Sequence, residues 1–216
     1  MTLFRTGFSV FVLMTIFSQL QAEDELSQFV AAHALFESSL AGNEADTETA
    51  IAQFAKLVEL DPEQPLYLAY LGSAYTLKAR DVWMPWSRLS NAEKGLDMID
   101  KALLMLEQRH DDERLRGSII SSETRLVAIN TFLEVPAFLN RAEDAKALLQ
   151  ETLDSPVFGA SAPEVKGRLF MQAATIAHRE KQLDQAVAYL RRALPLLPPG
   201  RHQQLAKQQL MKDSGQ

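Results

Sequence analysis

Apolar side chains recur at positions i, i+3, i+4 and i+7 along most of the chain, with polar residues between them. This spacing is typical of amphipathic helices, and no segment shows the two-residue alternation of a half-buried strand. The pattern therefore predicts an all-α protein. We expect helices over about 26–40, 47–60, 65–80, 112–133, 142–153 and 201–211, with two more beginning at Ser90 and near Ser161.

Short motifs mark where several of these helices begin or end. The segments SNAE (Ser90–Glu93) and SAPE (Ser161–Glu164) have the serine and glutamate of a capping box, which predicts a helix start at each serine. Pro136 lies in EVPAFLN and predicts a break between two helices, because the residue before a proline avoids the helical conformation.

Two segments far apart in the chain share one pattern. They are AIAQFAKLVELDP (Ala50–Pro62) and AVAYLRRALPLLP (Ala186–Pro198). Each begins with a small residue, has a bulky residue four positions later (Phe54 and Leu190), and ends in a proline at the twelfth step. A pattern that repeats in this way indicates a stack of similar helix pairs.

These segments and their neighbours resemble tetratricopeptide repeats, whose helix pairs follow a 34-residue pattern. The matching residues of one unit are Leu68, Leu71, Gly72, Tyr75, Gly95, Ile99 and Ala102, and those of another are Phe170, Ala173, Ala174, Ala177, Ala186, Leu190, Ala193 and Pro198. The chain departs from the family pattern because the usual tryptophan of the first helix is missing and Ala177 replaces the usual tyrosine. The resemblance implies an α-solenoid of about four helix pairs with a C-terminal capping helix.

The small residues of the pattern are expected to set how closely the helices pack. Gly72 carries no Cβ, so the second helix of its unit can approach the first without a steric clash. Ala102 and Ala193 are expected to act in the same way toward the next unit.

The bulky residues and prolines of the pattern have other expected roles. Phe54 and Tyr75 are expected to fill the space between helices. Pro62 and Pro198 are predicted to end the second helix of their units, because proline cannot continue a helix interior.

One segment does not fit the repeat. The register places the first position of the second helix at residue 84, but Gly95 fills that role, so about eleven residues are added around RDVWMPWSRLS (residues 80–90). Trp83 and Trp86 could anchor a partner, since tryptophan is enriched at the centre of interfaces. Alternatively, the insertion turns back and covers the apolar edge of the helices. We favour this second interpretation and expect at least one tryptophan to be buried.

The N-terminus has the pattern of a secretory signal peptide. Arg5 precedes the apolar run Gly7–Phe17, and a short polar region ends in Ala22. The apolar run is shorter than the roughly 20 residues that span a bilayer. We therefore expect export, cleavage near Ala22, a helical domain over 23–216 and no membrane span after cleavage. The protein would then be periplasmic or secreted, and an uncleaved membrane anchor is the alternative.

The amino-acid composition argues against several classes of function. The chain has no cysteine, which excludes disulfides, thiol catalysis and a cysteine-linked lipid anchor. The net charge is −6 and no stripe of lysine and arginine is present, which argues against nucleic acid and against a polybasic lipid-binding face.

No catalytic, cofactor or metal motif is found, so we expect a non-enzymatic protein without a cofactor. The histidines His33, His110, His178 and His202 are scattered, whereas a metal site needs several ligands on one face. HDDE (His110–Glu113) is the single cluster of histidine and acidic residues. It lies at an expected helix start, where acidic side chains favour the helix dipole.

Arg141 in FLNRAED has two possible roles. It could bind the carboxylate of a peptide, as clamp residues do in some proteins of the tetratricopeptide family. It could instead form a surface salt bridge that contributes little to stability, which we favour.

The leading hypothesis is a non-catalytic adaptor that binds a peptide or partner protein of the cell envelope, supporting an envelope or transport complex. Its candidate contact residues are Trp83, Trp86 and Arg141. The alternative is a small-ligand-binding protein or envelope enzyme with a pocket near the tryptophan-rich insertion. The sequence leaves the partner and the oligomeric state open.

Overall fold

The computed structural model describes the backbone of residues 6–214 and the side chains of residues 23–214. Most of this part is helical, as predicted. The α-helices are α1 (Thr6–Leu40), α2 (Ala45–Leu60), α3 (Pro65–Asp81), α4 (Pro85–Leu104), α5 (Ile120–Glu134), α6 (Ala142–Asp154), α7 (Pro156–Ala160), α8 (Pro163–Arg179), α9 (Leu183–Ala193) and α10 (Arg201–Asp213). Short 3₁₀ helices cover Gln108–Asp111, Ala137–Leu139 and Leu194–Leu196.

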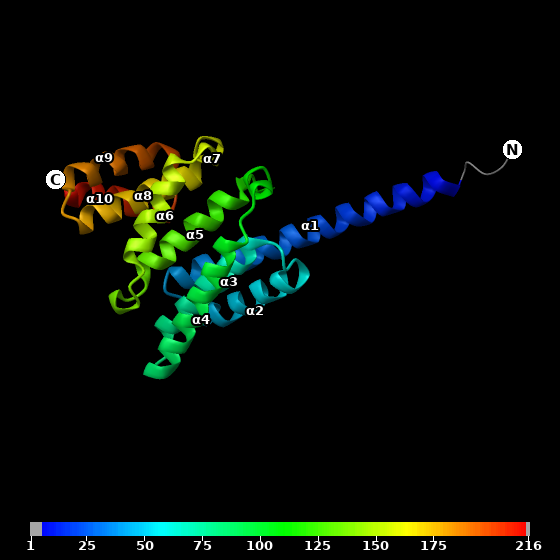
Figure 1. Cartoon of the computed structure of the whole chain (residues 1–216), viewed down its shortest axis with the longest axis horizontal. Coiled ribbons are helices and arrows are strands. Elements are labelled where there is room, and N and C mark those ends of the chain that lie inside the picture. The colour runs from blue at the N-terminus through cyan, green and yellow to red at the C-terminus, as the bar shows by residue number, and fades with distance from the viewer. Residues whose placement is uncertain (1–5, 215–216) are drawn as a thin grey trace.

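Helices that follow one another along the chain pack side by side. The pairs α1 with α2, α3 with α4, and α8 with α9 are in extensive contact. α5 packs on α3 and α4 on one side and on α6 and α8 on the other, so it joins the N-terminal helices to the C-terminal group (Figure 1). α10 packs on α9 and reaches back to the first helix, where Arg201 Nη2 donates to the carbonyl of Leu40 at 3.1 Å.

The crossing of α3 and α4 depends on two glycines. A Cβ added at Gly72 would lie 2.6 Å from the carbonyl oxygen of Gly95 and 2.9 Å from Cγ1 of Ile99. A Cβ added at Gly95 would in turn clash with the carbonyl oxygen of Gly72. The prediction that Gly72 permits a close approach is confirmed, and Gly95 makes the reciprocal contact.

An aromatic cluster forms the core between α1, α2 and α3. Phe54 and Tyr70 are fully buried and stack with ring centroids 5.2 Å apart and planes 5° apart. Phe29 and Phe36 of α1 meet the Tyr70 ring edge-on at 5.6 and 5.2 Å. The predicted filling role of Phe54 is confirmed, and Tyr70 is a core residue that the repeat pattern did not select.

Most other residues of the repeat pattern are also interior. Buried members are Leu68, Leu71, Ile99, Ala102, Phe170, Ala173, Ala174, Ala177, Ala186, Leu190 and Ala193. Tyr75 is partly buried, and the ammonium group of Lys94 lies 3.9 Å from its ring centroid.

The two prolines at the ends of the repeat segments behave differently. Pro62 follows α2 by two residues, in keeping with its expected role. The prediction for Pro198 is wrong, because α9 ends at Ala193 and a 3₁₀ turn containing Pro195 follows. Pro195 has no amide proton to continue the α-helical hydrogen bonds, so the helix ends before Pro198 is reached.

Both predicted capping boxes are wrong. Ser90 lies inside α4, which begins five residues earlier at Pro85, because proline fits the first position of a helix. α8 begins at Pro163 with Ala162 as its cap. The Ser161 hydroxyl instead donates to the Ser122 hydroxyl of α5 at 2.7 Å.

The helix predicted over 112–133 begins later than expected. Residues Arg114–Leu115 (β1) and Ser118–Ile119 (β2) form a small antiparallel hairpin, and α5 starts at Ile120. Arg116 and Gly117 form the turn with φ angles of 50° and 81°. Two positive φ angles in a row suit a two-residue hairpin turn, so the local turn replaces the first part of the predicted helix.

The predicted signal peptide is not tested. Arg5 lies outside the described residues, as do the side chains of the apolar run and of Ala22. Within residues 6–214, none of the helices combines the length and apolar character that a bilayer span requires.

Candidate functional site

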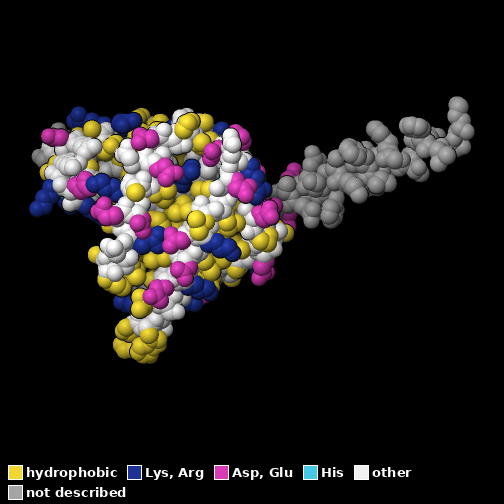
Figure 2. Space-filling model, viewed as in Figure 1, with side chains coloured by type: hydrophobic (Ala, Val, Ile, Leu, Met, Phe, Trp, Pro, Cys, Tyr) yellow, Lys and Arg dark blue, Asp and Glu magenta, His cyan; other side chains and the backbone are white. Residues whose placement is uncertain are grey.

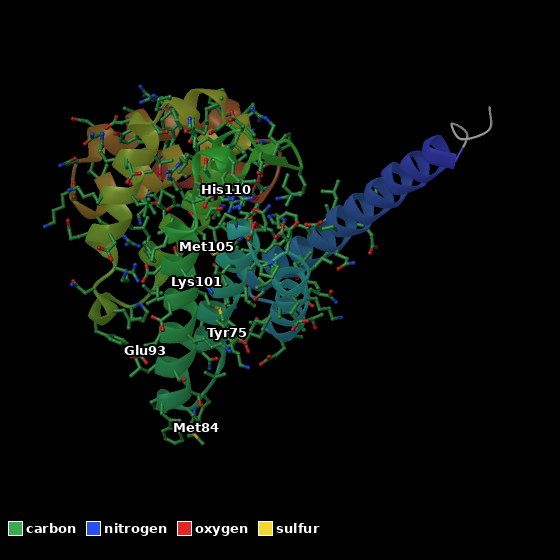
Figure 3. All side chains as sticks on the ribbon, turned by 45° about the vertical axis from the view of Figure 1, so that its right-hand side comes forward. Tyr75, Met84, Glu93, Lys101, Met105 and His110 are labelled. Carbon is green, nitrogen blue, oxygen red and sulfur yellow. The ribbon has the colours of Figure 1, made fainter. Side chains whose placement is uncertain are left out.

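Both tryptophans are exposed at the connection between α3 and α4. The side chains of Trp83 and Trp86 are 82% and 68% exposed, so the expected burial of at least one is wrong. Met84 and Leu89 beside them are each 41% exposed. We call Trp83, Met84, Pro85, Trp86 and Leu89 the tryptophan tip. Figure 3 shows Met84 at the far end of α4, beyond the body of the protein.

Local sequence explains why the tip projects. The added residues extend α4 back to Pro85, and Met84 takes the extended conformation of a residue before proline. The Arg88 guanidinium then closes the connection, because its Nε donates to the carbonyl of Val82 at 2.6 Å. The insertion therefore consists of the last residues of α3, a three-residue connection (82–84) and the first residues of α4, and does not fold back over the core.

The base of the tip is tied to the first two helices. Asp81 accepts a hydrogen bond of 2.7 Å from the hydroxyl of Thr47 in α2. Arg80 Nη2 donates to the carbonyl of Ser39 in α1 at 3.1 Å. These contacts lie immediately before the tip, so they hold the end of α3 against α1 and α2.

A groove of about 380 Å³ lies between α6, α8 and α9, and none of its lining residues comes from the tip. Its apolar part is formed by Leu149, Leu153, Ala173, Ile176, Ala177 and Tyr189. Its polar part is formed by Lys146, Gln150, Glu180, Gln182 and Gln185. This volume lies near the lower end of the range for ligand pockets, and it suits a few apolar side chains with polar flanks.

The polar edge of the groove has one positively and one negatively charged side chain, Lys146 and Glu180. The Lys146 ammonium group donates to Glu180 Oε1, which joins α6 to the end of α8 across one side of the groove. This hydrogen bond and the charge of Glu180 raise the pKa of Lys146 above its ordinary value. The remaining edge residues are glutamines, whose side chains both donate and accept hydrogen bonds.

Arg141 is the cap of α6, and it neither lines the groove nor belongs to the tip. Its guanidinium makes two hydrogen bonds to Asp100 of α4, at 2.6 and 3.0 Å, and one of 2.7 Å to Asp144. Its charged end also lies 3.8 Å from the ring centroid of Phe132. Three of its five N–H donors are thus used within the protein, which favours a salt bridge over the clamp, although the side chain is only 15% exposed and the bridge is not the surface one expected.

A polar network crosses the interior between α3 and α5. The Tyr70 hydroxyl donates to Glu123 Oε1 at 2.7 Å, and Arg116 Nη2 donates to the same oxygen at 2.9 Å. Burial, and then the charge of Glu123, raise the pKa of Tyr70 well above its ordinary value. Within the described residues, the buried oxygen Oε2 of Glu123 has no hydrogen-bond partner.

Two histidines lie beside this network. Burial lowers the pKa of His33 to about 3, helped by the charges of Arg116 and Arg168. Burial and the charge of Arg168 likewise lower the pKa of His202 to about 4. His33 is therefore neutral at pH 7, and its Nε2 lies 3.8 Å from Glu37 Oε1 without forming an ion pair.

The acidic cluster at His110 has a structural explanation. His110 is buried, and its Nδ1 accepts a hydrogen bond of 2.9 Å from the backbone amide of Glu107. This contact caps the 3₁₀ helix Gln108–Asp111. Across the described part of the chain, no three acidic or histidine side chains are grouped closely enough to hold a metal ion.

Sequence reasoning found the tip but missed the groove and the interior network. The groove draws its lining from three helices, and the Tyr70 and Glu123 side chains lie 53 residues apart in the chain. The run YLAYLGSAY contains Tyr70 but does not indicate its partner. Comparison of the chain with family models, curated proteins and solved structures gave no match.

Proposed function

We propose that the protein is a non-catalytic interaction module of the cell envelope that binds a segment of a partner protein in the groove between α6, α8 and α9. The observation that carries the proposal is the chemistry of this groove, in which apolar side chains from three helices are bordered by glutamines and by the Lys146–Glu180 pair. An apolar floor with a few polar groups is typical of sites that recognise peptides.

The helical-repeat character of the chain supports the proposal. Neighbouring helices pack in pairs, and the residues of the tetratricopeptide pattern are mostly buried between them. Stacked helix pairs expose extended surfaces that bind peptides and partner helices. We propose that the chain is an exported tetratricopeptide-like protein, on the basis of this pattern and of the signal-peptide pattern at its N-terminus.

The test is photocrosslinking from the groove in the native envelope. A photoreactive residue at Gln185, which is exposed at the edge of the groove, is compared with one at Lys56, which is exposed on α2. We expect one dominant partner to crosslink from Gln185 and not from Lys56. The same partner crosslinking equally from both positions would contradict binding in the groove.

A substitution that places a charge in the floor of the groove is a second test of the proposed function. Ile176 is only partly buried, so Ile176→Glu places a carboxylate among the apolar lining with limited effect on folding. We expect this variant, checked for a wild-type circular dichroism spectrum, to lose the crosslink from Gln185. An undiminished crosslink in the folded variant would show that the partner does not use the groove.

A further inference from the structure

The tryptophan tip is the part of the surface that the proposed function leaves unexplained. It gathers two exposed tryptophans, a methionine and a leucine within seven consecutive residues. Figure 2 shows a compact apolar cluster at the lower end of the molecule, beyond the mixed charged surface of the body. Figure 3 places Met84 at that end. A compact group of exposed apolar side chains of this kind marks an interaction site.

The tip is held in shape before any partner binds. The close contact of Gly72 with Gly95 fixes α3 against α4, and Pro85 begins α4 directly at the tip. The Arg88–Val82 hydrogen bond closes the connection between the helices. Because this rigid end is convex, it suits a partner that can deform around it and does not require a complementary pocket.

The charge at the tip favours an anionic partner. Residues 78–94 carry four basic side chains and two acidic ones, whereas the whole chain has a net charge of −6. Lys78 and Arg80 pair with Glu48 and Asp81. Between residues 23 and 214, Arg88 and Lys94 form no ion pair, and both side chains are exposed. From Val82 to Ala92 the single charged residue is Arg88, so the tip has one positive charge on an otherwise acidic protein.

We propose that the tip inserts into the headgroup region of an anionic lipid bilayer. Indole rings prefer the membrane–water interface, where their apolar faces leave water and their N–H groups stay hydrated. Arg88 follows Trp86 by two residues and lies where its guanidinium can meet lipid phosphates while its stem covers apolar surface. The inference goes beyond the proposed function and does not rest on it, because the groove lies on other helices.

Tryptophan fluorescence can report the contact between the tip and a lipid bilayer. Trp83 and Trp86 are its two tryptophans, so tryptophan fluorescence, excited where tyrosine does not absorb, reports on the tip alone. The full chain is mixed with vesicles of equal parts phosphatidylcholine and phosphatidylglycerol. We expect the emission maximum to shift to shorter wavelength by about 10 nm as the indoles leave water. Brominated lipids are expected to quench the emission, because quenching requires that the indoles reach the lipid.

Variants that keep both tryptophans test the contact itself. Met84→Glu places a charge in the tip and is expected to weaken vesicle partitioning by about tenfold or more, since charged side chains disfavour insertion. Arg88→Glu also removes the hydrogen bond to Val82, so it is expected to weaken binding to all vesicles, and to weaken binding to anionic vesicles several-fold more than binding to pure phosphatidylcholine. Leu104→Glu is the matched control, because Leu104 is 86% exposed at the opposite end of α4, and we expect wild-type partitioning.

Three results would overturn the proposal. The first is binding of the full chain to vesicles without quenching by brominated lipids, since attachment would then occur elsewhere. The second is wild-type partitioning of Met84→Glu. The third is a shift in emission that follows protein concentration in the absence of vesicles, which would assign the tip to a second copy of the chain. Ile176→Glu is expected to leave vesicle binding unchanged, so the groove and the tip can fail separately.

Discussion

Replacing Gly72 by alanine tests the glycine contact on which the α3–α4 crossing depends. The new methyl group would lie 2.6 Å from the Gly95 carbonyl oxygen, so this contact must lengthen by about 0.8 Å to reach an ordinary 3.4 Å. The obstructing atom belongs to the backbone and cannot rotate away. The two helices must therefore separate along buried contacts that include Ile99, which is fully buried.

The expected change in the free energy of unfolding is the difference between two opposing effects. Alanine is favoured over glycine in a helix interior by about 1 kcal/mol. Overpacking a well-packed interface costs about 1–3 kcal/mol, and a rigid backbone obstacle places this site at the upper end. We expect Gly72→Ala to lower the free energy of unfolding by about 2 kcal/mol. With a urea dependence of about 2 kcal/mol per molar, the unfolding midpoint falls by about 1 M.

The assay is urea unfolding followed by the circular dichroism of the helices. Gly159→Ala is the matched control, because a Cβ at Gly159 meets no atom within 4 Å and the residue lies in a helix. We expect this control to change the free energy of unfolding by less than about 0.5 kcal/mol. If both variants unfold at the wild-type urea concentration, the close approach of α3 and α4 is refuted.

Three further predictions concern the interior network and the tip. The pKa values of His33 and His202, about 3 and about 4, lie below the ordinary 6.5, so the unfolded chain takes up protons first as the pH falls. Stability is therefore lost from pH 6.5 downward, by about 2 kcal/mol for His33 between pH 7 and pH 5 and by less for His202, whose greater exposure to solvent screens its interactions, and equal unfolding midpoints at both pH values would contradict this. Tyr70→Phe is expected to cost about 1–3 kcal/mol in urea unfolding, because it removes a donor from a buried carboxylate, whereas an unaffected midpoint would argue against the network. Trp83→Ala and Trp86→Ala are expected to change the free energy of unfolding by less than about 0.5 kcal/mol each, and a loss of about 3–5 kcal/mol would indicate burial instead.

The sequence predicts the fold class and much of the packing because those features are local or repeat at a fixed spacing. The helical period identified the all-α class, and the repeat pattern selected core residues such as Phe54 and Leu190 correctly. Gly72 could be interpreted from its type alone, since a glycine inside a helix weakens it and needs a packing reason.

Errors arose where two local signals competed. Ser90 matches a capping box, but Pro85 offers a helix start five residues earlier and extends α4. Arg116 and Gly117 form a turn within a segment of helical composition. In the insertion, the general tendency of tryptophan to be buried suggested a covered loop, whereas the early start of α4 at Pro85 leaves Trp83 in a short connection and Trp86 in the first turn of the helix, both exposed.

The candidate sites were predictable to different degrees. The tip is contiguous in sequence, so Trp83 and Trp86 could be singled out before their exposure was known. The groove is assembled from α6, α8 and α9, and residues such as Leu149 and Ile176 have an ordinary helical pattern in sequence. Only the packing of the three helices brings these side chains to one surface.

The most direct test of the account is the dissociation constant of the partner captured from Gln185, measured by titration calorimetry with the purified proteins. We predict that Ile176→Glu raises this constant by about tenfold or more, because it places a charge where the partner buries apolar side chains. Lys56→Glu, on the exposed face of α2, should leave the constant at its wild-type value. Equal constants for the wild type and Ile176→Glu would contradict the central claim that the groove binds the partner.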